Sequence, residues 1–114
     1  MPPQSESQLQ DAIRLELGAT GEILLHRNNV GMARMPNGAP IKFGVGNPGG
    51  ADLVGVYRGR ALYVEIKTPT GRQSPEQKAF QSLVERHGAI YRILRSVEDA
   101  QSFLAELRSQ EVAA

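Results

Sequence analysis

The chain has 114 residues, of which 40% are hydrophobic, and no cysteine, so a disulfide framework and a thiolate metal site are excluded. Its size suits one domain, 1–114 with a core from about residue 5 to 108, and we expect neither a membrane span nor a secretion signal. The net charge is only +1, but residues 27–78 hold eight basic and three acidic side chains, a local +5 against −4 elsewhere. This distribution favours a phosphate-bearing partner, although a solvated surface of mixed charge is the simpler alternative.

A helix is predicted at the start of the chain. Ser5-Glu6-Ser7-Gln8 has the Ser-x-x-Gln form of a capping box, and apolar residues follow at helical spacing until Gly18. Glu6 and Glu16 both lie towards the apolar side of this helix. An acid in the first turn also suits the helix dipole, which explains Glu6 without any further role.

Two short strands and several turns are predicted next. Residues 22–28 indicate a strand, residues 28–40 are rich in turn formers, and residues 41–44 indicate a second strand that pairs with a neighbour. Residues 44–50 contain four glycines and one proline. Such a segment is either a flexible loop or a place where another backbone approaches closely, which would hold the following Asp52 at a bent strand start.

The central prediction is a hairpin over residues 49–67 with a tight turn at Arg58-Gly59. This turn pairs Val54 with Tyr63 and places Asp52 opposite Glu65. Like charges directly opposed in a sheet, with Cβ atoms about 5 Å apart, are destabilising. A divalent cation between the two carboxylates would compensate for the repulsion.

The second strand of this hairpin has two different faces. Leu62, Val64 and Ile66 point one way, while Tyr63, Glu65 and Lys67 point the other, because successive side chains alternate. Glu65 and Lys67 therefore share a face with the expected cation. The plainer interpretation is a surface hairpin with an ordinary ion pair.

The last part of the chain predicts helix, strand and helix. Ser74 and Pro75 begin a helix that runs to His87, with Gln77 in its first turn and Phe80, Leu83 and Val84 on its apolar face. Residues 89–94 indicate a strand, residues 96–107 a helix, and the tail from 109 is expected to fray. The strand-helix-strand unit implies parallel strands, so the predicted fold is α/β, a small mixed β-sheet flanked by α-helices.

Two other kinds of active site are not expected. A histidine-asparagine nuclease centre at His26 would need a second catalytic histidine or further ligands, and His87 is the only other histidine. The phosphate loop G-x-x-x-x-G-K-[S/T] is absent from the sequence, so no nucleotide cofactor is expected.

Asp52, the triplet Glu65-Ile66-Lys67, Gly71 and Gln77 together resemble the VRR-NUC branch of the PD-(D/E)XK nucleases, over about residues 6–104. Ala51 stands where the family pattern has proline, a position that carries no catalytic atom. The resemblance implies a restriction-endonuclease-like mixed sheet and a metal-dependent DNA endonuclease.

The resemblance also implies roles for individual residues. Asp52, Glu65 and the main-chain carbonyl of Ile66 would hold Mg²⁺, or Mn²⁺ in its place, joined by a glutamate near the start of the first helix. Glu6 matches that position better than Glu16. Lys67 would orient water or stabilise charge, and Gln77 would lie near the site, unless it is simply a solvent-facing residue.

The expected substrate is branched DNA, above all the four-way Holliday junction, cut by a homodimer. This expectation rests mainly on the resemblance, because stand-alone domains of this type look like junction resolvases. The alternatives are an inactive nuclease fold that binds nucleic acid, a flap-directed or non-specific nuclease, and a structural partner protein. No membrane partner is expected, and the setting would be the cytoplasm of a bacterial or phage-infected cell.

Overall fold

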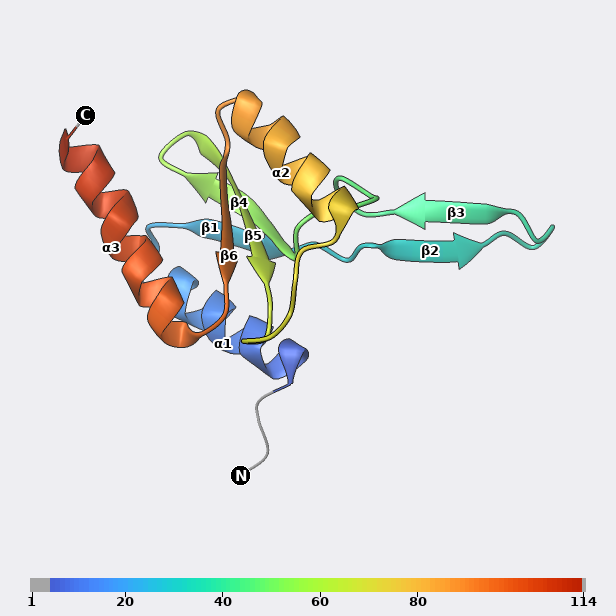
Figure 1. The fold of residues 1–114 in the computed structure, drawn as a ribbon, viewed down its shortest axis with the longest axis horizontal. Helices are drawn as coiled ribbons and strands as arrows, with labels where there is room; N and C mark the ends of the chain where they lie inside the picture. The colour runs from blue at the N-terminus through green and yellow to red at the C-terminus, as the bar shows by residue number, and fades with distance from the viewer. Residues whose placement is uncertain (1–4, 114) are drawn as a thin grey trace.

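The computed structural model describes residues 5–113, with side chains to residue 110. Three helices and six strands occur in this range (Figure 1). Their order is α1 (Glu6–Gly18), β1 (Leu24–Arg27), β2 (Gly31–Arg34), β3 (Pro40–Phe43), β4 (Leu53–Tyr57), β5 (Arg60–Ile66), α2 (Pro75–Arg86), β6 (Ile90–Leu94) and α3 (Val97–Ala113). Within the described range, no helix is long and apolar enough to cross a membrane.

The main sheet has the strand order β1-β4-β5-β6. β4 pairs antiparallel with β1 and β5, whereas β6 pairs parallel with β5, so the predicted mixed sheet is confirmed. The predicted hairpin register is also confirmed, with Val54 opposite Tyr63 and Tyr57 opposite Arg60. Positive φ angles at Arg58 (46°) and Gly59 (83°) fit the two-residue turn that the right-handed twist of a hairpin favours.

Helices cover both faces of the sheet, with α1 and α3 on one side and α2 on the other (Figure 1). Leu62, Val64 and Ile66 of β5 are fully buried against α1 and α3, as their alternation predicts. Each such aliphatic side chain contributes about 1.5–3 kcal/mol through removal from water. The strand that carries Glu65 is therefore among the most firmly held in the protein.

The predicted capping box at Ser5 of α1 is present, and Ser74, predicted to begin α2, forms a second capping box with Gln77. Two expectations about helices are wrong. Leu83 is 46% exposed, because only one stripe of α2 packs on the sheet and Leu83 lies beside it, against a shallow groove with Ala79 and Pro48. α3 continues to Ala113 instead of fraying from residue 109.

A second, two-stranded sheet was only half predicted. The strand at 40–43 pairs antiparallel with β2 at 31–34, in a segment that the sequence indicates as turns. Every residue from 32 to 46 is exposed, so neither strand shows the apolar alternation of a half-buried strand. The β2–β3 hairpin extends away from the main sheet along the long axis of the molecule, whose extents are 53 × 41 × 26 Å (Figure 1).

Candidate metal centre

Asp52 lies at the bend where the chain enters β4, and two hydrogen bonds hold it there. Its Oδ2 accepts from the backbone N–H of Ile66 at 2.8 Å. Its main-chain carbonyl accepts from the backbone N–H of Asn28, also at 2.8 Å. The carboxylate is thus fixed beside the end of β5, where the hairpin register predicts it.

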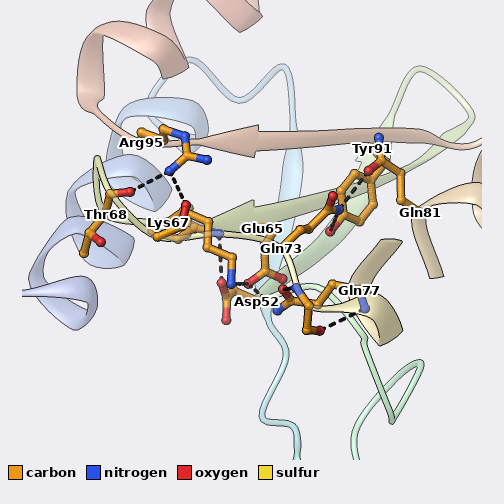
Figure 2. A network of polar contacts seen from close by, with 12 residues as sticks. Asp52, Glu65, Lys67, Thr68, Gln73, Gln77, Gln81, Tyr91 and Arg95 are labelled. Atoms are coloured by element: carbon orange, nitrogen blue, oxygen red, sulfur yellow. Dashed lines mark hydrogen bonds and ion pairs between the residues drawn. The ribbon is translucent and has the colours of Figure 1, made fainter. Parts of the chain in front are cut away.

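Glu65 is the most unusual side chain of the site, because it is a carboxylate only 2% exposed. Its Oε1 accepts from Gln77 Nε2 at 3.3 Å and lies 3.8 Å from Lys67 Nζ (Figure 2). Its Oε2 is buried and has no hydrogen-bond partner among the described residues. A buried carboxylate oxygen without a donor is costly unless a proton or a cation compensates.

The surroundings of Glu65 favour its neutral form when no cation is present. Burial first, and then the neighbouring Asp52 carboxylate, raise the pKa of Glu65 to about 9, although the Lys67 ammonium acts in the opposite direction. A cation bound between Asp52 and Glu65 would favour the ionised form of Glu65 instead, because it stabilises both carboxylates at once. The group of carboxylates could therefore hold either a proton or a cation.

A third carboxylate comes from the start of α1. Glu6, Asp52 and Glu65 each place one oxygen within 4.8 Å of the other two. Oxygen ligands on opposite sides of a divalent cation lie about 4–5 Å apart, so the three residues could hold a metal ion. Glu16 lies elsewhere and accepts a hydrogen bond from Gln101 of α3 at 3.1 Å.

Of the remaining predicted site residues, Lys67 and Gln77 lie beside Glu65 in the same network (Figure 2). Gln77 also completes the α2 capping box, its Oε1 accepting from the Ser74 backbone N–H at 2.9 Å. Its side chain thus joins the helix start to the acidic group, and it is half-buried instead of solvent-facing. The ligand role of the Ile66 carbonyl stays a prediction.

Arg95 supports this site from the junction between β6 and α3. Its guanidinium Nη1 donates to the carbonyls of Thr68 and Gly71, each at 2.7 Å (Figure 2). The loop after β5 is thereby folded back over the Lys67 side chain, whose Cδ would lie 3.5 Å from a Cβ at Gly71. Sequence reasoning missed Arg95, because both of its contacts lie more than twenty residues away and no local pattern marks them.

Asp52 and Glu65 lie in the wall of a cleft of about 780 Å³. The cleft runs between α1, the root of the β2–β3 hairpin and the start of α2. Its other lining residues include Gln10, Arg27, Asn28, Lys42, Phe43, Gly49, Ser74 and Glu76. Arg27 and Lys42 bring positive charge into it, as the charge distribution of the sequence suggests.

Comparison with known proteins supports the fold and goes no further. No family model matches the chain, and no curated protein matches it. A solved structure described as a VRR_NUC domain superposes with a TM-score of 0.62, covering 88% of this chain and 94% of that one at 19% sequence identity. The chain thus has a VRR-NUC-like fold, which confirms the predicted fold class.

Proposed function

We propose that this chain is a metal-dependent DNA endonuclease that hydrolyses phosphodiester bonds. The observation that carries this proposal is the buried Glu65 carboxylate, whose Oε2 has no hydrogen-bond partner among the described residues and which lies within ligand distance of the Asp52 and Glu6 carboxylates. A lysine next to such a group and a cleft in front of it complete what phosphodiester hydrolysis requires. The likeness to a structure described as a VRR_NUC domain agrees with this chemistry.

The proposed ligands are the carboxylates of Asp52, Glu65 and Glu6 with the main-chain carbonyl of Ile66. An all-oxygen set suits Mg²⁺, and we expect Mn²⁺ to substitute for it. Such an ion, when bound, lowers the pKa of a water ligand and neutralises charge on the scissile phosphate.

Lys67 and Gln77 have separate roles in this proposal. The Lys67 ammonium, one residue beyond the end of β5, lies 3.8 Å from Glu65 Oε1 and stabilises negative charge on a phosphate oxygen bound in front of them. Gln77 donates to Glu65 Oε1 and so fixes the orientation of the carboxylate. Its amide adds no charge, which leaves the acidic group free to bind a cation.

An inactive nuclease fold that only binds nucleic acid is the main alternative. The complete Asp, Glu and Lys set argues against it, since a binding module has no use for a buried carboxylate with a raised pKa. A structural partner protein would show no salt-dependent affinity for DNA.

The proposed substrate is branched DNA, and the proposed active form is a homodimer of one-domain subunits spanning residues 1–114. A four-way junction requires two nicks on symmetry-related strands, and each chain offers one candidate centre among its described residues. A two-fold dimer supplies both centres. We also propose that the protein acts in the cytoplasm of a bacterial or phage-infected cell.

The test is a panel of labelled linear, flapped and four-way DNA incubated with the protein in Mg²⁺, Mn²⁺ or EDTA. We expect paired nicks in the junction, dependent on metal, and a dimer mass by light scattering. Equal cutting of junction and linear duplex by a monomer would leave a flap-directed or non-specific nuclease as the better description. Metal-independent DNA binding without any cutting would favour the inactive fold.

A further inference from the structure

The β2–β3 hairpin, residues 31–43, forms an arm that the main sheet does not cover. Its strands pack chiefly against each other, and Figure 1 shows them projecting beyond α2 and β4. A two-stranded ribbon is only marginally stable alone in water. Met32, Ile41 and Phe43 are nevertheless 57%, 42% and 45% exposed. These side chains are accessible to another molecule.

The charge of the arm indicates what that molecule is. No acidic residue occurs between Glu22 and Asp52, whereas this segment contains Arg27, Arg34 and Lys42. Met32 pairs with Lys42 and Arg34 with Pro40, and directly paired residues in an antiparallel ribbon share a face, so the two cations project together. Arg34 also donates to the Gly38 carbonyl at 2.9 Å, which holds it near the tip of the arm.

The root of the arm is fixed relative to the metal centre. The Asn28 side chain donates to the carbonyls of Val45 and Ala51, both at 2.9 Å, and accepts from the Val45 N–H at 3.0 Å. The Asn47 side chain donates to the carbonyls of Gly31 and Phe43 at 2.8 and 2.9 Å, and these two residues form the strand pair nearest the main sheet. The strand start at Asp52 and the base of the arm therefore form one hydrogen-bonded unit.

The glycine-rich segment between the arm and Asp52 is packed and not loose. A Cβ at Gly46 would lie 2.3 Å from the Phe80 ring, and one at Gly49 would lie 2.3 Å from the Glu76 carbonyl of α2. Both glycines have positive φ, 76° and 88°, which other residues rarely adopt. The arm is thus held at a set position against the start of α2.

We propose that the β2–β3 arm binds the phosphate backbone of the DNA duplex that leads into the cleft. Its cationic face reaches the cleft, because Lys42 belongs to the arm and also lines the cleft with Arg27, Asp52 and Glu65. Phosphate contacts of this kind position a duplex without reading its sequence. Because the role presupposes the proposed nuclease function, binding and cutting are measured separately.

The first experiment measures binding of a fluorescein-labelled duplex and a labelled four-way junction in EDTA, over a range of salt. Arg34→Ala/Lys42→Ala should weaken binding of both DNAs and reduce the salt slope of log K by about 1.8, since each lost phosphate contact removes about 0.9. The affinity advantage of the wild type then shrinks about tenfold between roughly 50 and 200 mM salt. The matched control Arg14→Ala/Arg86→Ala removes two exposed cations from α1 and α2 and should keep the wild-type slope.

The second experiment shortens the arm. Replacing residues 32–42 by Asn-Gly joins the paired residues Gly31 and Phe43 through a two-residue turn and leaves the root bonds of Asn47 in place. We expect a folded protein by circular dichroism, with a raised KM for DNA cleavage and a nearly unchanged kcat. Metal affinity should also be unchanged.

Three outcomes separate the possibilities. Wild-type affinity and salt slope in the double variant would overturn the role of the arm, even if the protein is a nuclease. An arm-dependent salt slope in a protein that never cuts DNA would support the arm and refute the nuclease. A shortened chain that falls from dimer to monomer, while the double variant binds DNA normally, would assign the arm to contact between copies and overturn the proposal.

Discussion

Replacing Glu65 by glutamine should remove a specific pH dependence from the stability of the metal-free protein. The pKa of Glu65 is raised from 4.5 to about 9 by burial and by Asp52, so the folded protein binds this proton more tightly than the unfolded chain does. The stabilisation from that proton is fully present below about pH 4.5 and is lost as pH rises towards 9. Glutamine keeps the shape of the neutral acid and has no proton to lose.

The magnitude follows from linkage. Between the two pKa values, one extra proton on the folded state lowers the free energy of unfolding by up to about 1.4 kcal/mol per pH unit. The wild type should therefore lose up to about 3 kcal/mol relative to Glu65→Gln between roughly pH 6 and 8. Urea denaturation in EDTA at several pH values measures this difference, because titrating groups remote from Glu65 cancel between the two proteins.

Added Mg²⁺ extends the same experiment. The cation competes with the proton, so it should stabilise the wild type more at high pH than at low pH and have little effect on Glu65→Gln. Glu16→Gln is a matched control, since that carboxylate contacts Gln101 and not the acidic group. Stability curves of wild type and Glu65→Gln that stay parallel across this range would refute the account of Glu65.

Three further predictions concern the surroundings of the centre. Lys67→Met should retain or slightly tighten metal binding, measured by calorimetry, while the rate of single-turnover cleavage falls about 10²–10³-fold, the usual effect of losing one charge-stabilising donor. Lost metal affinity with an unchanged cleavage rate per bound ion would instead make Lys67 a structural partner of Glu65. Arg95→Gln removes two hydrogen bonds of 2.7 Å and should lower the free energy of unfolding by about 2–3 kcal/mol. Amide hydrogen exchange at residues 68–71 should become faster, and DNA cleavage slower, while metal affinity stays normal. Unaltered exchange at these residues would contradict the positioning role of Arg95. Gly50→Ala places a Cβ 2.0 Å from the Val45 carbonyl and should cost about 3 kcal/mol or more in thermal or urea unfolding, whereas Gly18→Ala, with nothing within 4 Å, should be neutral or stabilising.

Local rules were sufficient for the elements that hold the centre. The Arg58-Gly59 turn and the alternation of β5 fixed the hairpin register, because a slip of one residue would expose every core side chain of the strand. The capping box at Ser5 located the start of α1, and Ser74 followed by Pro75 located the start of α2. The neighbourhood of Asp52 and Glu65 was thus predictable from short-range chemistry.

The features that local sequence patterns do not show depend on contacts between distant segments. Whether Glu6 or Glu16 lies near Asp52 is decided by how α1 packs on the sheet, which the helix sequence does not show. Arg95 contacts carbonyls on another loop, and carbonyls carry no residue signature. The strand at 31–34 is exposed on both faces and so lacks the apolar period that identifies a strand.

Cleavage of a labelled four-way junction by the purified wild type and by Asp52→Asn, in Mg²⁺ and in EDTA, tests the central claim most directly. The asparagine keeps an oxygen that can accept from the Ile66 N–H, so the fold should persist while the charge of the ligand is lost. We predict nicking by the wild type in Mg²⁺ alone and none by Asp52→Asn in either condition. Equal nicking by both proteins, or nicking that continues in EDTA, would contradict a metal-dependent nuclease centred on Asp52 and Glu65.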